Sequence, residues 1–129
     1  MARPKSDILT ERESQIMDIL WELKNATADD VRERLPGNLH DSTVRTMLRI
    51  LKTKNYVSMD TRGRRAVYRP IVTRARVQRK VAKSLLKRFF SGSAEDLVLR
   101  LLEDEQLTTT QLDKLKRAHS SRRTRRGKL

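Results

Sequence analysis

Residues 40–53 carry two unlike faces at helical spacing, and this stretch constrains the fold more than any other. Val44, Met47, Leu48 and Leu51 recur at i, i+3, i+4 and i+7, which places them in one apolar stripe on a helix. The opposite side is polar and carries arginine and hydroxyl side chains: Ser42, Thr43, Arg45, Thr46 and Arg49. Such a face suits the DNA major groove, where Arg pairs with guanine and Ser or Thr meets base edges or phosphates. The alternative is an ordinary solvated helix face.

Composition narrows the class of protein. The net charge of +14 over 129 residues suggests a polyanionic partner, and nucleic acid fits a chain of this size better than a membrane surface. The chain has no Cys, which excludes disulfides and thiol chemistry, and its two His residues lie far apart. We therefore expect neither a metal nor a cofactor. We expect no membrane insertion and a cytoplasmic location, since no apolar run approaches about 18 residues and the start lacks an apolar signal core.

Two shorter helices are predicted before residue 40. Thr10 and Glu13 have the spacing of a capping box, and Thr27 precedes acids in the first turn of a second helix. Pro36-Gly37 ends that second helix. Three helices, the last two joined by a brief turn, form a helix-turn-helix arrangement whose final helix is the stretch from residue 40 to residue 53.

A basic β-hairpin is predicted directly after these helices. Residues 56–60 and 66–69 have the residue types of two short strands, and the connection 61–65 contains Gly63 and three arginines. These arginines are Arg62, Arg64 and Arg65. After a helix-turn-helix, such a hairpin is a wing whose arginines can reach phosphates or a minor groove. A solvated turn kept soluble by charge is the alternative.

The remainder of the chain is predicted to be helical and then disordered. A long helix from Thr73 to about Phe90 carries seven Lys or Arg and no acid, and its basic amphipathic character also fits a surface binder. The next helix, capped at Ser93, is apolar on more than one side, so it needs a second chain to cover it. Residues 108–111 begin a last helix, and residues 120–129 carry five positive charges and are expected to be a disordered basic tail.

The predicted fold is mainly α with a small β-hairpin. We expect a winged helix-turn-helix DNA-binding domain at residues 1–72 and a helical dimerisation domain at residues 73–119. The apolar side chains expected to form the homodimer are Val81, Leu85, Phe89, Leu97, Val98, Leu101, Leu102, Leu112 and Leu115.

The chain resembles the penicillinase-repressor family, which includes the methicillin-resistance and copper-responsive repressors. The resemblance rests on four segments in order and at the family's spacing, and it extends from about Leu9 to Ala118. These segments are LTERESQIMDILWEL, STVRTMLRILKTKNYV, GRRAVYRPIVT and DLVLRLLEDEQLT. The resemblance implies a winged-helix dimer that binds palindromic operators and represses transcription. It also implies release by a membrane sensor-transducer, which triggers cleavage within the segment that matches DLVLRLLEDE.

The sequence departs from the family pattern in two places that concern its inducer. Copper-responsive members use Cys ligands, and this chain has none, so a copper role is rejected. Antibiotic-responsive members carry an Asn-Phe bond where this chain has Arg100-Leu101. The inducer and the cleavage mechanism therefore stay open.

Two other classes of function compete with a sequence-specific repressor. The charge of +14 also fits an architectural protein that binds DNA or RNA without sequence preference. An enzyme is disfavoured, because the sequence shows no Ser–His–acid set, no Gly-rich phosphate loop and no carboxylate pair in a plausible cleft.

Overall fold

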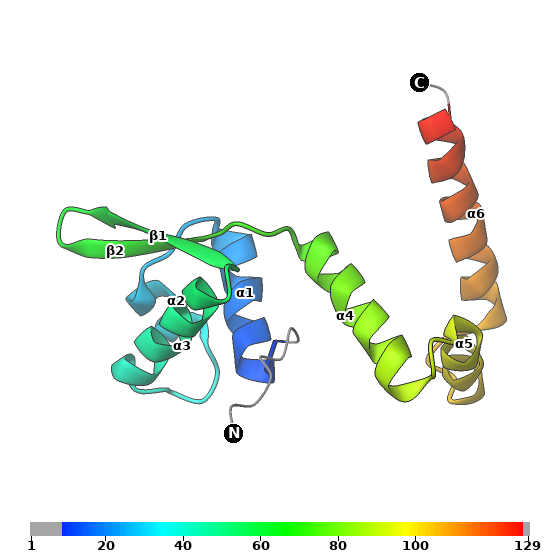
Figure 1. The fold of residues 1–129 in the computed structure, drawn as a ribbon, viewed down its shortest axis with the longest axis horizontal. Helices are drawn as coiled ribbons and strands as arrows, with labels where there is room; N and C mark the ends of the chain where they lie inside the picture. The colour runs from blue at the N-terminus through cyan, green and yellow to red at the C-terminus, as the bar shows by residue number, and fades with distance from the viewer. Residues whose placement is uncertain (1–8, 128–129) are drawn as a thin grey trace. The chain divides into compact units, whose positions relative to one another are not determined.

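The computed structural model of the chain describes residues 9–127 and consists of helices with one two-stranded sheet (Figure 1). The elements in order are α1 (Glu11–Leu23), α2 (Ala28–Arg34), α3 (Asp41–Thr53), β1 (Val57–Arg62), β2 (Arg65–Pro70), α4 (Arg74–Phe89), α5 (Ala94–Glu103) and α6 (Thr109–Gly127). The prediction of a mainly helical fold with a small hairpin is confirmed.

Side-chain caps begin the first two helices at the predicted residues. The hydroxyl of Thr10 accepts a hydrogen bond from the Glu13 amide, while the Glu13 carboxylate accepts one from the Thr10 amide. Thr27 and Asp30 form the same reciprocal pair at the start of α2. Each pair satisfies amide groups that a helix N-terminus would otherwise leave without partners.

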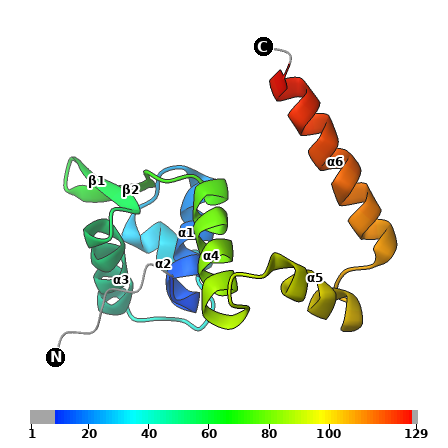
Figure 2. The same cartoon turned by 45° about the vertical axis from the view of Figure 1, so that its right-hand side comes forward.

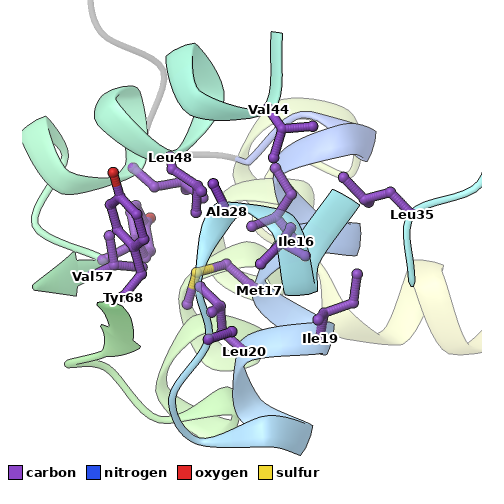
Figure 3. Close-up of a cluster of buried hydrophobic side chains, with 14 of the residues drawn as sticks. Ile16, Met17, Ile19, Leu20, Ala28, Leu35, Val44, Leu48, Val57 and Tyr68 are labelled. Carbon is purple, nitrogen blue, oxygen red and sulfur yellow. The ribbon is translucent and has the colours of Figure 1, made fainter. Parts of the chain in front are cut away.

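The core of the helix-turn-helix is formed by apolar side chains from α1, α2 and α3 and from both strands (Figure 3). Its largest fully buried members are Ile16, Met17, Leu20, Val31, Val44, Leu48, Leu51 and Val57. Each of these contributes on the order of 1.5–3 kcal/mol by leaving water. The apolar stripe predicted on α3 is thus the surface that fixes this helix to the rest of the fold.

The far end of α3 is held by a partly buried ion pair. Glu13 in α1 is 4% exposed, and its carboxylate accepts hydrogen bonds from Lys54 Nζ at 3.0 and 3.2 Å. Burial raises the pKa of Glu13, but hydrogen bonds from Thr10 and Lys54 outweigh it, so the pKa is lowered overall. Asn55 then ends the helix with a φ of 66°, as its tolerance of the left-handed conformation predicts.

The hairpin is longer and its turn tighter than the sequence predicted. The strands pair from Val57↔Pro70 to Arg62↔Arg65, so only Gly63 and Arg64 form the turn. Gly63 has a φ of 65° and Arg64 does not have a positive φ, which is the pattern of a type II′ turn. This turn matches the twist of the strands, and pairing can therefore continue to the end of the hairpin.

Two long-range contacts attach the hairpin to the helices. Ala26 and Tyr68 exchange backbone hydrogen bonds of 3.0 and 2.8 Å, so the α1–α2 connection extends the sheet by one bridge. Trp21 Nε1 donates to the carbonyl of Val72 at 2.9 Å, which fixes the segment that follows β2. Both views show the hairpin beside α3 (Figures 1 and 2). A hairpin that would be marginal alone thereby gains packing partners.

The chain divides into two compact units, and the division falls between Val81 and Ala82, inside α4. The expected boundary between residues 72 and 73 falls within the first unit. Val77 is buried in the core of that unit and Val81 packs partly against it, so the first half of α4 belongs with the helix-turn-helix and its hairpin.

The second unit contains the rest of α4 together with α5 and α6. Ser93 caps α5, and Thr108 and Gln111 form a capping box at α6, as the sequence predicts. The expectation of disorder from Ser120 is wrong for residues 120–127, which continue α6. This segment has no Pro and no Gly before Gly127, and Arg is a good helix former. Residues 128–129 lie outside the described part of the chain.

Candidate nucleic-acid interface

Helix α3 presents two faces of opposite character. Val44, Leu48 and Leu51 are 0% exposed, while Met47 is half-buried at the edge of the core. All five residues predicted for the reading surface are exposed: Ser42, Thr43, Arg45, Thr46 and Arg49. Because the buried stripe fixes the rotation of the helix, the polar face is directed away from the core. Lys52 and the 42% exposed Ile50 are also open on α3, although the sequence reasoning did not include them.

Not every hydroxyl on this face is equally available. Thr46 Oγ1 donates a hydrogen bond of 2.9 Å to the carbonyl of Ser42. The proton of Thr46 is therefore used within the helix, which leaves its oxygen lone pairs for a donor outside the chain. The sequence could not show which hydroxyl hydrogens bond back to the helix.

The N-terminus of α3 is capped by His40. Nδ1 of His40 accepts a hydrogen bond from the Ser42 amide at 3.3 Å and lies 2.9 Å from Ser42 Oγ. The cap therefore also orients the first hydroxyl of the exposed face. Ser, Asp and Asn are the usual capping residues, so the sequence did not single out His40.

An ion pair occupies the first turn of the same face. Arg45 Nε donates a hydrogen bond of 2.8 Å to Asp41 Oδ2, four residues earlier in the helix. This hydrogen bond lowers the pKa of Asp41, and the same bond raises the pKa of Arg45. Both groups are therefore charged at neutral pH. Sequence spacing allowed the pair, but the exposed face was predicted without it.

The three predicted wing arginines lie at the tip of the hairpin. Arg62 and Arg65 form its last cross-strand pair, Arg64 is in the turn, and all three are exposed. Like charges directly opposite each other destabilise a hairpin. A polyanion at the tip would relieve this repulsion. Arg69, which the sequence reasoning omitted, adds a further exposed cation and donates through Nε to Ser58 Oγ at 3.1 Å.

The structure leaves all of the predicted dimerisation residues half-buried or exposed. Val81 belongs to the first unit, while the others lie on α4, α5 and α6 of the second. Among the described side chains of residues 82–123 none is buried, and Phe89 and Leu115 are 69% and 57% exposed. Leu99, which was not among the predicted residues, is 54% exposed. In the single chain Leu85, Phe89 and Leu115 are exposed, and the other predicted residues are only half-buried.

The bond between Arg100 and Leu101 lies inside α5. Arg100 is exposed and its Nη1 is 3.3 Å from Glu103 Oε2, whereas Leu101 is half-buried. A protease binds an extended backbone, so a cut at this bond requires α5 to open locally.

Residues 9–127 contain neither a candidate metal site nor a membrane-spanning helix. The described residues contain no group of three or more His, Cys, Asp or Glu that could hold a metal ion. None of the described helices is long and apolar enough to cross a membrane.

The sequence model of the penicillinase repressor family matches residues 9–120. The chain belongs to the penicillinase repressor family. The penicillinase repressor of Bacillus licheniformis is 26% identical over 109 residues, which cover 83% of this chain and 85% of that protein. The methicillin resistance regulatory protein MecI of Staphylococcus aureus strain N315 is 23% identical over 110 residues, which cover 84% of this chain and 89% of that protein.

Two solved structures resemble the chain more loosely. One is the Bacillus licheniformis BlaI monomer in complex with the blaP half-operator, with a TM-score of 0.46 and 23% identity over 56% of this chain and 87% of that one. The other is Bordetella bronchiseptica BpsR, described for regulation of its DNA binding by 6-hydroxynicotinic acid, with a TM-score of 0.48 and 21% identity over 76% and 74%. The family resemblance expected from the sequence is confirmed by the family match.

Proposed function

We propose that this chain is a sequence-specific DNA-binding transcriptional repressor that acts as a homodimer on a palindromic operator. The observation that carries the proposal is the division of α3 into a fully buried apolar stripe and an exposed face of arginines and hydroxyls. A helix held rigidly by its back can present a constant set of donors to the major groove. Membership in the penicillinase repressor family supports the same function.

The two groups of arginines would contact different parts of the DNA. Arg45 and Arg49 on α3, with Ser42, Thr43 and Thr46, would meet base edges and nearby phosphates in the major groove. Arg62, Arg64 and Arg65 on the wing would meet phosphates or an adjacent minor groove. Phosphate contacts fix the register of the protein, and base contacts supply the sequence preference.

The homodimer would cover the apolar side chains of α4, α5 and α6. These side chains are exposed or half-buried in the single chain, and a second copy offers a matching surface under two-fold symmetry. Two reading helices related by that symmetry require half-sites about 10 bp apart or a multiple of that spacing. Specific dissociation constants of about 10⁻⁸ to 10⁻¹¹ M near physiological salt would be typical of such a complex.

Repression would end when this apolar interface is broken. Cleavage between Arg100 and Leu101 would separate α6 and the end of α5 from the rest of the chain, and a membrane sensor-protease system is one candidate trigger. Because the bond lies inside α5, cleavage would have to follow local unfolding. A small-molecule or protein signal is the alternative, and it would leave the chain intact. Following the length of the chain during induction distinguishes the two.

An architectural protein without sequence preference is the second candidate function, because a charge of +14 favours it. The two are separated by selecting bound fragments from a genomic library and comparing the best fragment with random DNA of equal length. A repressor should prefer its site by about 10³-fold or more. Equal affinity for both DNAs would contradict the repressor and support the architectural function. Neither candidate is an enzyme, and both act in the cytoplasm.

A further inference from the structure

Asp41 is the one acid on α3, and it lies in the first turn, where an acid stabilises the helix N-terminus. Asp41 precedes a segment that contains no further acid until Asp60, in a chain with a net charge of +14. A carboxylate beside DNA repels phosphates and lowers affinity for every sequence. An acid at this position therefore lowers the affinity for DNA of any sequence. A gain in discrimination between bases would offset that loss.

The carboxylate of Asp41 has two oxygens in different surroundings. Oδ2 accepts the hydrogen bond from Arg45 Nε at 2.8 Å. Oδ1 is buried and, in the described part of the chain, has no hydrogen-bonding partner. The hydrogen bond to Arg45 therefore uses the one carboxylate oxygen that has a partner. Because both side chains are partly exposed, the pair adds little to stability, and its effect is to orient Arg45.

The bond through Nε restricts how Arg45 can meet a base. With Nε engaged, the terminal nitrogens Nη1 and Nη2 are the donors left for a partner outside the chain. Two parallel donors match the two acceptors of guanine, O6 and N7, in the major groove. A free arginine side chain would instead adjust to other bases or turn toward a phosphate.

We propose that Asp41 is a specificity-determining positioning residue that holds Arg45 for end-on bidentate recognition of guanine. Asp41 acts through Arg45 and makes no base contact of its own. This inference rests on the proposed function, because it requires that α3 read the major groove. Loss of Asp41 removes a negative charge and frees Arg45, so affinity for random DNA rises while the preference for guanine at one position falls.

The experiment compares full-length variants on the DNA that the wild-type chain selects from a random library. Each base of one half-site is replaced in turn, and the affinity is measured for wild type, Arg45→Ala, Asp41→Ala and Asp41→Asn. Glu11→Gln is the matched control, because Glu11 is also a first-turn acid, on α1, and its side chain is exposed. This control removes the same charge without touching the Asp41–Arg45 hydrogen bond.

Arg45→Ala should erase the guanine preference at one position, which is about 5- to 150-fold for a bidentate pair. Asp41→Ala should lower the preference at the same position by about fivefold or more. Asp41→Asn should retain an intermediate preference, because an amide oxygen still accepts from Nε but carries no charge. Glu11→Gln should leave all base preferences unchanged.

Three results would overturn the inference. A uniform gain in affinity for all sequences with Asp41→Ala and Asp41→Asn, at unchanged guanine preference, would reduce Asp41 to an electrostatic role while the proposed function stands. No loss of guanine preference with Arg45→Ala would remove the contact that Asp41 is proposed to position. If the wild-type chain selects no sequence, the proposed function fails and this inference fails with it. Thermal melts of each variant exclude unfolding as the cause, and Asp41→Asn keeps the shape of the side chain.

Discussion

Leu48 in α3 and Leu99 in α5 both lie on amphipathic helices, yet the first is fully buried and the second is 54% exposed in the single chain. The first unit has enough helices, together with a hairpin, to surround its apolar side chains. In the second unit none of the described side chains is buried. The same kind of sequence pattern thus completes a core in one unit and leaves an open surface in the other. We infer that the first unit is stable alone and the second depends on a partner.

The largest effect should follow removal of the open apolar surface. Truncation after Arg100 removes Leu101, Leu102, Leu112 and Leu115, each worth on the order of 1.5–3 kcal/mol when buried. The dimer should then dissociate at cellular concentrations, and operator affinity should fall by about 100-fold or more. Gel shifts measure the affinity, and a circular dichroism melt should show that the first unit stays folded.

Truncation after Ala118 is the matched control, because it removes the basic C-terminus and keeps the apolar residues. This variant should remain a dimer and lose only salt-sensitive affinity for all DNA. If the chain that ends at Arg100 bound the operator within about threefold of full length, the second unit would not control binding.

Within the first unit, two neighbouring residues of α3 test whether the core is complete in a single chain. Leu48→Ala opens a cavity in a closed core and should lower the free energy of unfolding by about 2–5 kcal/mol. Ile50→Ala, on the 42% exposed side of the same helix, should change it by about 0.5 kcal/mol or less. Urea unfolding measures both values. Equal losses would show that both sides of α3 are buried in solution.

The ion pair between Glu13 and Lys54 gives the first unit a defined response to acid. The lowered pKa of Glu13 means that its stabilising contribution is present above the ordinary carboxyl pKa, near 4.5, and is lost as pH falls through the folded value. Glu13→Gln should lower the free energy of unfolding by about 1–3 kcal/mol at neutral pH and weaken its decline at acidic pH. Glu11→Gln, an exposed first-turn neighbour, should change neither quantity appreciably. If the stability of Glu13→Gln declined at acidic pH as steeply as that of the wild type, other carboxylates would be responsible for the decline.

The caps and the stripe of α3 could be predicted from sequence because both are local patterns. Thr10, Thr27 and Ser93 act on amides three residues away, and the positions of Val44 and Leu51 follow from helical spacing. These features require no knowledge of the remaining chain.

Contacts between distant segments could not be predicted in the same way. The Ala26–Tyr68 bridge and the Glu13–Lys54 pair join residues far apart in sequence, and no periodic pattern marks them. The hydrogen bonds of Asp41 and Thr46 depend on side-chain rotamers. Residues 120–127 were expected to be disordered because of their positive charge. They form the end of α6, and they contain no helix-breaking residue before Gly127.

A smaller effect separates the wing from α3 inside the first unit. Arg64→Ala should weaken binding to all sequences alike and reduce the slope of log affinity against log salt by about one. Arg49→Ala should instead relax the preference at particular bases. Titrations of each variant on operator and random DNA at several salt concentrations measure both effects. Identical sequence-independent losses would place the reading face elsewhere.

The most direct test of the contrast between the two units is the number of chains bound to one operator. Sedimentation equilibrium at micromolar concentration, with and without the selected DNA, measures this number. We expect a dimer of the free chain and two chains on each palindrome, with the dimer lost on truncation after Arg100. A monomer in both conditions would contradict the account, because the apolar surface of the second unit would then remain uncovered.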